Sequence, residues 1–329
     1  MASGDSPRGV ANIKPPWEAT ITANHEDLRA VVEEQFPSLA PITRWELIGS
    51  GWDNDVWRAD ERWVFRFPRR RLAIQLLECE RAILPGISAS LPIPISSPRF
   101  FGEASARFPH IFNGYEYLEG RGACVVNPSE AKRAEHAHVL SGFLTALHGA
   151  AGDADVISTA PRMSTREDIQ HRAAWAIGER EKLRASGLID SNSSLEPTAA
   201  QVEAISDGLE PVRDDERCWV HGDLYVRHIL LNDQHDISAV IDWGDVSWGD
   251  RAYDLGIAFA YLPQSAYEDF AAAQGLEYGS MLWRRALLTS LRHGLALLSY
   301  GMDIEDADLV REAARIRARF ASEASSFLL

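Results

Sequence analysis

Two apolar runs that each end on an acidic turn constrain the fold of this chain more than any other feature. The first is W-V-H-G-D-L-Y-V-R-H-I-L-L, in which Asp223 follows a strand-like segment. The second is A-V-I-D-W-G-D, in which Asp242 lies 19 residues further along. The apolar runs between Ile229 and Ile241 predict a hairpin that returns the chain. We therefore expect the two carboxylates to face one cleft.

Five short apolar segments near the N-terminus predict a small sheet. The expected strands are Trp45 to Ile48, Asp55 to Ala59, Trp63 to Phe67, Arg99 to Gly102 and Ile111 to Leu118. A short amphipathic helix is expected from Leu28 to Phe36. A second helix is expected from Leu72 to Leu84, ending at Pro85-Gly86.

Beyond Gly122 the apolar residues recur mainly at helical spacing. Helices are expected at Ser129 to Leu147, Thr165 to Ala185, Pro197 to Gly208, Leu255 to Tyr261, Ala266 to Gln274, Ser280 to Tyr300 and Asp306 to Phe320. A strand-like island interrupts them at Cys218 to Val220, Ile229 to Leu231 and Ile237 to Ile241. The pattern predicts an α+β chain with a loose tail at 1–20, a small antiparallel-sheet lobe at 21–117 and a larger, mainly helical lobe at 118–329.

Composition narrows the possible partners and the compartment. The net charge is −15, which disfavours nucleic acid and would attract cationic ligands, although such a charge also serves solubility alone. The three cysteines, Cys79, Cys124 and Cys218, are far apart in sequence and suggest a reducing compartment without disulfides. No apolar run approaches the roughly 20 residues of a membrane span, and the N-terminus is not a signal peptide. We expect a cytoplasmic protein with no membrane partner.

Two convergent carboxylates on fixed turns suit phosphoryl transfer. One carboxylate orients the acceptor hydroxyl and takes its proton, while the other holds Mg²⁺, which screens the phosphate oxygens. Positioning and electrostatics supply most of the rate in such reactions. Taken alone, Asp223 could instead be a simple turn or cap residue.

The two motifs, H-G-D-L-x-x-x-H and I-D-W-G-D, resemble the catalytic loop and the metal-binding segment of the aminoglycoside and macrolide phosphotransferase family. The resemblance extends from about Trp45 to Asp254. It implies a bilobal, protein-kinase-like fold in which Asp223 is the catalytic base and Asp242 the principal Mg²⁺ ligand. It also implies transfer of the γ-phosphoryl group of ATP or GTP to a hydroxyl of a small molecule.

His228 stands where protein kinases carry an asparagine that binds metal. Neutral imidazole is a weaker partner for Mg²⁺ than oxygen. The 2''-aminoglycoside and macrolide kinases that the chain resembles also have histidine here, which implies a metal role for His228. A packed histidine without such a role is the alternative.

His221 opens the same motif. A general-base role is conceivable for a lone histidine, but the resemblance implies that His221 is a structural residue of the catalytic loop. A zinc site built from His221, His228 and His235 lacks the clustered Cys or the H-E-x-x-H helix that would support it.

The predicted nucleotide site lies in the N-terminal half. Gly49-Ser50-Gly51-Trp52-Asp53-Asn54 falls between two strands, where a flexible loop carrying Ser50 and Asn54 could cover the phosphates. A plain hairpin turn would explain this segment equally well. There is no Walker-A sequence, which disfavours the P-loop class.

Arg66 lies about where the resemblance implies the phosphate-binding lysine of kinases. In W-V-F-R-F, Arg66 must face away from Phe65 and Phe67, as a cleft-lining residue should. An exposed strand arginine is the alternative. Its expected helical partner is Glu80; Glu78 competes but lies on a different helix face.

The segment from Phe112 to Leu118 resembles the inter-lobe hinge of the family. The resemblance implies that the backbone of Glu116, Tyr117 and Leu118 binds the purine edge. Tyr115 falls about where a bulky residue restricts adenine and leaves guanine acceptable, so both ATP and GTP are candidate donors. Simple strand packing is the alternative for Tyr115.

Three acidic residues follow the metal-binding segment. Asp245 is the candidate substrate contact, whereas Asp250 and Asp254 match a family segment that braces the catalytic loop. An acidic cleft would suit a polyamine sugar, because its ammonium groups would find carboxylate partners.

The leading hypothesis is therefore an antibiotic-resistance kinase that acts on an aminoglycoside hydroxyl. A macrolide 2'-phosphotransferase is the first alternative, and it should have a large apolar pocket. A housekeeping kinase for choline, homoserine or a sugar is the second. A pseudokinase or nucleotide-binding module is disfavoured by the intact Asp223 and Asp242.

Overall fold

The computed structural model describes residues 19–161, 169–190, 193 and 195–328. Most of the expected N-terminal tail therefore lies outside the described residues. Where the description begins, the backbone N–H groups of Thr20 and Ile21 both donate to the carbonyl of Arg69, at 2.8 Å. The last part of the expected tail is thus hydrogen-bonded to the segment that follows the third strand.

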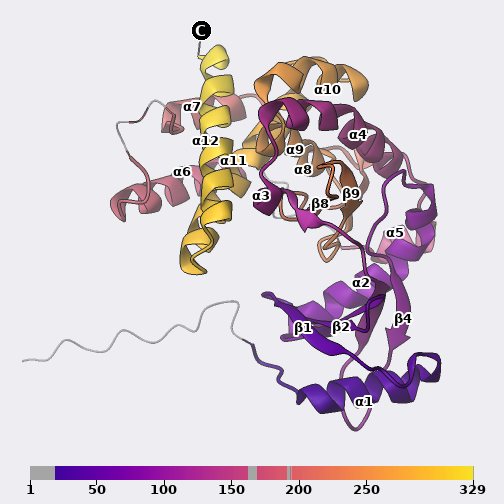
Figure 1. The fold of residues 1–329 in the computed structure, drawn as a ribbon. Helices are drawn as coiled ribbons and strands as arrows, with labels where there is room; N and C mark the ends of the chain where they lie inside the picture. Colours follow the sequence, from indigo (N-terminus) through magenta and orange to yellow (C-terminus); the bar gives the residue numbers. More distant parts are fainter. Residues whose placement is uncertain (1–18, 162–168, 191–192, 194, 329) are drawn as a thin grey trace, which may run out of the picture. The chain divides into compact units, whose positions relative to one another are not determined.

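The chain folds into two compact units (Figure 1). The first comprises Met1–Leu77 and Arg99–Tyr115, and the second comprises Glu78–Pro98 and Glu116–Leu329. Each unit has its own hydrophobic core. The expected fold class is confirmed: an antiparallel sheet dominates the first unit and helices dominate the second.

The first unit is built on a five-stranded sheet with the order β1-β2-β3-β5-β4. The strands are β1 (Trp45–Ser50), β2 (Asn54–Ala59), β3 (Trp63–Pro68), β4 (Pro98–Gly102) and β5 (Phe112–Glu116). All five expected strands are therefore present. Helix α1 (His25–Gln35) precedes them and is capped by Asn24, whose side chain accepts the N–H of Glu26 at 2.9 Å. A short 3₁₀ turn, η1 (Pro37–Leu39), follows α1.

Aromatic side chains fill the core of this unit. Phe67 stacks on Phe112 with ring centroids 4.8 Å apart. Phe65 and Phe67 are both buried on the core side of β3. Because neighbouring residues of a strand point to opposite faces, this packing directs Arg66 to the other face of the sheet. Alternation along one strand thus sets the orientation of a candidate site residue.

Helix α2 (Arg71–Ile87) corrects one expectation. The helix was expected to end at Pro85-Gly86, but it includes both residues and continues to Ile87 before η2 (Ser88–Ser90). Proline removes one backbone hydrogen bond from a helix. Burial of Leu84 and Ile87 in the core of the second unit stabilises the last turn and outweighs that loss.

The second unit is mainly helical. Its helices are α3 (Ala123–Val126), α4 (Glu130–His148), α5 (Ala154–Thr159), α6 (Ile169–Ala185), α7 (Ala199–Ser206), α8 (Ala252–Leu255), α9 (Ile257–Tyr261), α10 (Tyr267–Ala273), α11 (Met281–Asp303) and α12 (Ala307–Ala324). The described part of this unit also contains the 3₁₀ turns η3 (Asp214–Glu216), η4 (Gln264–Ala266) and η5 (Ser325–Phe327). Helices α3 and α5 were not predicted, and the expected helix start at Thr165 lies outside the described residues.

Two small sheets interrupt these helices. The predicted hairpin is present as β8 (Ile229–Leu231) and β9 (Ile237–Val240), with β6 (Arg121–Gly122) on the free edge of β8. Strand β7 (Cys218–Val220) pairs separately with β10 (Ser247–Gly249). Strands β6 and β10 were not predicted. The two acidic turns therefore leave two different sheets, one after β7 and one after β9.

Helices α11 and α12 lie side by side in the second unit (Figure 1). Two glycines of α11 allow this close approach. A Cβ atom on Gly294 would lie 2.7 Å from Cγ2 of Ile316, and one on Gly301 would lie 3.1 Å from Cβ of Leu309. Larger residues at these positions would push α12 away from α11.

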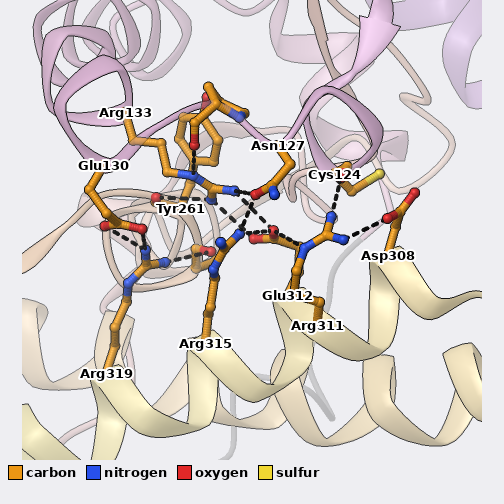
Figure 2. Close-up of polar contacts among 12 residues, drawn as sticks. Cys124, Asn127, Glu130, Arg133, Tyr261, Asp308, Arg311, Glu312, Arg315 and Arg319 are labelled. Atoms are coloured by element: carbon orange, nitrogen blue, oxygen red, sulfur yellow. Dashed lines mark hydrogen bonds and ion pairs between the residues drawn. The ribbon is translucent and has the colours of Figure 1, made fainter.

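A buried ion pair joins α4 to α12 (Figure 2). The Arg133 and Glu312 side chains are both 0% exposed. Nη1 and Nη2 of Arg133 donate to Oε2 and Oε1 of Glu312 at 3.0 and 2.9 Å. Arg133 also donates to the carbonyl oxygens of Pro128 and Tyr261. The pair thus connects three segments of the second unit.

All three cysteines are free thiols. In the described part of the chain, no helix combines the length and the apolar character needed to cross a membrane.

Candidate active site

The turn after β7 carries His221, Gly222 and Asp223. Gly222 has a φ of +83°, a conformation that glycine adopts without strain. The buried carboxylate of Asp254, on α8, accepts the backbone N–H of His221 at 2.9 Å and that of Gly222 at 3.0 Å. These bonds fix the turn to a helix of the core, which fits the bracing role expected of Asp254.

His221 uses both ring nitrogens within the protein. Its Nε2–H donates to the carbonyl of Ile241 at 3.0 Å, and its Nδ1 accepts the N–H of Asp223 at 3.2 Å. Burial lowers the pKa of His221 and favours the neutral ring. His221 therefore connects the two acidic turns and has no nitrogen left for a metal or an acceptor hydroxyl.

No support emerges for the zinc alternative. Within the described residues, no three His, Cys, Asp or Glu side chains lie where they could hold a metal ion together. His235 lies elsewhere in the unit, in the turn after β8, where its carbonyl oxygen is 2.9 Å from Nε2 of His136.

His228 brings the two acidic turns together. Its Nδ1–H donates to the backbone carbonyl of Asp223 at 2.8 Å, and its Nε2 lies 3.2 Å from Oδ2 of Asp242. The His228 side chain is 6% exposed, whereas the Asp223 and Asp242 side chains are 39% and 45% exposed. Two solvent-accessible carboxylates thus flank one buried imidazole, as expected if both turns serve a single reaction.

The charge of this cluster suits a divalent cation. Burial opposes protonation of His228, but the neighbouring Asp242 and Asp223 carboxylates outweigh it and raise the pKa of His228. The two carboxylates thus favour positive charge beside them, either a proton on Nε2 of His228 or a metal ion that displaces this proton. Because the Nδ1–H of His228 is engaged by Asp223, only Nε2 faces Asp242. The carboxylate of Asp242, assisted by Nε2 of His228, fits the hard, oxygen-preferring Mg²⁺ ion.

Asp242 has a strained backbone with a φ of +64°. This left-handed conformation is unfavourable for residues other than glycine. Trp243, which follows, is fully buried, and its indole N–H donates to the carbonyl of Val240 at 3.1 Å. Packing of Trp243 stabilises a turn that the local backbone alone would not favour.

His293 is a neighbour of the cluster that the sequence did not predict. Its Nδ1 lies 3.9 Å from Oδ1 of Asp223. The ring of Tyr225 lies between the two imidazoles, 4.3 Å from that of His228 and 4.7 Å from that of His293. His293 comes from α11, where the break of an apolar run by Arg292 and His293 was the available sequence signal.

Two arginines lie close to this group in sequence. The Arg227 guanidinium lies 5.8 Å from the Tyr300 ring, and that of Arg292 lies 5.3 Å from the Trp175 ring. Asp245, the expected substrate contact, is partly exposed in the turn between β9 and β10. Its role stays a prediction.

The first unit holds four of the predicted nucleotide-binding residues. Oγ of Ser50 donates to Asp55 at 2.6 Å, and Oδ1 of the buried Asn54 has no hydrogen-bond partner in the described part of the chain. The Arg66 guanidinium lies 5.9 Å from the ring of the buried Tyr115. Strands β3 and β5 thus bring Arg66 and Tyr115 together.

The remaining predicted nucleotide-binding residues belong to the second unit. Glu80 is a buried residue of α2, and Glu116, Tyr117 and Leu118 follow at the end of β5. Their roles in purine binding, and the expected pairing of Glu80 with Arg66, stay predictions.

Comparison with protein families gives a match over most of the chain. The model of a family described as "Phosphotransferase enzyme family" matches residues 44–288. This range contains β1 to β10 and both acidic turns. Among curated proteins, no match was found.

Solved structures with a similar fold include three phosphotransferases. The GDP complex of wild-type aminoglycoside 2'-phosphotransferase-IIIa has a TM-score of 0.64 and 21% identity, covering 92% of this chain and 99% of that one. The gentamicin complex of APH(2")-IIa has a TM-score of 0.57 and 18% identity, covering 92% and 99%. The macrolide 2'-phosphotransferase MphH from Brachybacterium faecium has a TM-score of 0.52 and 25% identity, covering 83% and 91%. The resemblance inferred from the two motifs is confirmed.

Proposed function

This chain belongs to the phosphotransferase enzyme family and is a kinase-type transferase, and we propose that Asp223, His228 and Asp242 form its catalytic centre. The centre would move the γ-phosphoryl group of a nucleoside triphosphate to a hydroxyl group of a small molecule. One observation carries the proposal. The imidazole of His228 contacts both acidic turns, at 2.8 Å to the Asp223 carbonyl and 3.2 Å to the Asp242 carboxylate.

Asp223 has the properties of a base that orients an acceptor hydroxyl. Its carboxylate is accessible, while its backbone is fixed on both sides, through Asp254 before it and through His228 after it. A fixed carboxylate can align the hydroxyl oxygen and accept its proton without reorganisation. Mg²⁺ bound at Asp242 and His228 would screen the negative charge of the donor phosphates.

The phosphoryl donor in this proposal is ATP or GTP. Arg66 and Tyr115 lie together on the sheet of the first unit, where a guanidinium can bind phosphate and a buried ring can limit the size of the base. Solved relatives of this fold include GDP and ADP complexes. Both donors must therefore be tested side by side.

An aminoglycoside is the acceptor that we propose first. The strongly acidic chain would attract a polycationic sugar, and the accessible Asp223 and Asp245 could pair with ammonium groups. Two of the structural relatives described above are aminoglycoside phosphotransferases.

A macrolide is the second candidate acceptor, and a specific observation favours it. The side chains nearest to Asp223 include the aromatic pair Tyr225 and His293. A large, weakly charged acceptor with apolar faces would pack better against this group.

A transfer screen tests the proposal. Purified protein with Mg²⁺ is incubated with γ-labelled ATP or GTP and a panel of aminoglycosides, macrolides and hydroxylated metabolites. Asp223→Asn should abolish transfer and leave nucleotide binding within about two-fold of the native value. Asp214→Asn, at an exposed position of η3, is the matched control. If Asp223→Asn turned over any acceptor at the native rate, Asp223 could not be the base.

A further inference from the structure

A cavity lies within the helical unit, outside the group around Asp223. It has a volume of about 410 Å³ and opens where the C-terminal ends of α4 and α10 meet the residue before α8. Its lining includes Thr145, His148, Arg251, Ala273 and Gln274. The proposed reaction gives none of these five residues a role.

The cavity contains a cation that the described protein does not neutralise. The Arg251 side chain is partly exposed and makes no hydrogen bond or ion pair with any described residue. The two acidic neighbours in sequence have other partners. Asp250 forms an ion pair with Arg285, with Oδ2 and Nε 3.0 Å apart, and Asp254 accepts a hydrogen bond from Nε2 of His148 at 3.1 Å. A guanidinium in a cavity is suited to bind a phosphate or a carboxylate.

Two neighbouring side chains add hydrogen-bond acceptors. His148 is 7% exposed, its Nε2 lies 3.1 Å from Oδ2 of Asp254, and its buried Nδ1 lacks a partner in the described part of the chain. When Nε2–H donates to Asp254, Nδ1 is an acceptor. The Gln274 amide nitrogen donates to the carbonyl of Ser141 at 2.8 Å and to Oγ1 of Thr145 at 3.2 Å. The amide oxygen of Gln274 is therefore the second acceptor. A ligand for this cavity should therefore carry hydroxyl donors as well as negative charge.

We propose that this cavity binds a small hydroxylated oxyanion, a phosphate or a carboxylate, and that its occupancy changes the catalytic turn. The connection is short. His148 in the cavity wall contacts Asp254, and Asp254 holds the backbone N–H groups of His221 and Gly222, next to Asp223. A ligand that shifts His148 acts on the carboxylate that fixes the turn, and such differential binding is what couples two sites.

Binding is measured first, without reference to turnover. Isothermal titration uses glycerol 3-phosphate, malate and inorganic phosphate as probes, with saturating Mg²⁺ and ADP so that the phosphates do not occupy the nucleotide site. The native chain should bind at least one probe. If glycerol 3-phosphate binds and malate does not, the cavity is a phosphate site. If malate binds and glycerol 3-phosphate does not, it is a carboxylate site.

Two variants and one control locate the binding. Arg251→Gln should lower the affinity for the probe by at least about ten-fold, because one charge-assisted contact is lost. Ala273→Phe, at an exposed helical position of the cavity lining, should block the cavity without removing a charge. Arg213→Gln, an exposed arginine of the same unit, should bind as the native chain does. The proposal is overturned if no probe binds, or if Arg251→Gln and Ala273→Phe both retain native affinity.

The coupling is measured with His148→Gln. In the native chain the bound probe should change the rate of phosphoryl transfer by about three-fold or more, within the usual range of coupling between sites. His148→Gln should bind the probe more weakly, because the Nδ1 acceptor is lost. At a saturating concentration of the probe it should no longer show this response, and an unchanged response would refute the connection through Asp254. Because the titration needs no acceptor, failure of the proposed transferase reaction would leave the binding result standing, and the two failures are distinguishable.

Discussion

Replacement of Glu312 by glutamine should be among the most destabilising single changes in the helical unit. Glu312 and Arg133 are both completely buried and share two hydrogen bonds, of 3.0 and 2.9 Å (Figure 2). Glutamine keeps the shape but leaves the Arg133 guanidinium in the core without its counter-ion. Removing one partner of a buried pair costs about 3–5 kcal/mol, and we expect this loss in the free energy of unfolding.

The same contacts predict that replacing Arg133 and replacing Glu312 have different costs in the free energy of unfolding. Besides Glu312, Arg133 has neutral oxygen partners in the described residues, namely Pro128, Tyr261 and Asn127. Glu312 has further cations, because Arg315 donates to it and Nε of Arg311 lies 3.6 Å away (Figure 2). Arg133→Met should therefore cost less, about 1–3 kcal/mol, since Glu312 keeps counter-ions that reach it from α12.

Urea unfolding followed by circular dichroism gives both values, with Glu135→Gln on the exposed face of α4 as the control. The double variant Arg133→Met with Glu312→Gln should lose less stability than the sum of the two single changes, because it leaves no unpaired charge of this pair in the core. The reasoning is refuted if Glu312→Gln costs less than about 1 kcal/mol, or if Arg133→Met proves the more costly single change.

Three further predictions concern the catalytic turn, the metal and pH. Asp254→Asn should lower the rate of transfer by about 100-fold through misplacement of the turn, while nucleotide affinity stays native; an unchanged rate in a single-turnover assay would contradict this. Asp242→Asn should weaken Mg²⁺-dependent nucleotide binding by about 30-fold, because one charged contact to the metal is lost. If the native chain bound nucleotide equally well with and without Mg²⁺, Asp242 could not act as a metal ligand in nucleotide binding. Burial lowers the pKa of His136 in the folded chain. The neutral His136 ring therefore stabilises the fold fully above the unfolded pKa of about 6.5. This stabilisation is lost as the pH falls through the lower pKa of the folded state. In urea unfolding between pH 5 and pH 8, His136→Gln should therefore depend less on pH than the native chain, and parallel curves would disprove the assignment.

The elements that the sequence predicted correctly are those with a strong local pattern. Strand β3 follows directly from the alternation in W-V-F-R-F, and the β8–β9 hairpin from two apolar runs around a polar turn. The predicted end of α2 was wrong because burial of Leu84 and Ile87 outweighs the local effect of Pro85. The pairing of β7 with β10 depends on tertiary contacts that neither segment encodes alone.

The residues of the candidate site also differ in how clearly the sequence indicates them. Asp223, His228 and Asp242 lie in two motifs whose spacing is visible in the sequence, and the structure brings them together. His293 joins them from α11, and His148 reaches Asp254 from the end of α4. Neither histidine lies in a recognisable motif, because its position depends on how distant helices pack. The motifs reveal the reactive groups, whereas the packing of the helices determines what surrounds them.

The positive φ of Asp242 has a consequence for how such a chain evolves. An aspartate in this conformation costs about 1–3 kcal/mol, which glycine would not incur. Selection for catalysis keeps the aspartate, and selection for stability acts against it. In a lineage released from the need to transfer phosphate, drift to glycine at position 242 would stabilise the fold. Glycine there in an otherwise intact descendant would mark a protein that has kept the scaffold and abandoned the chemistry.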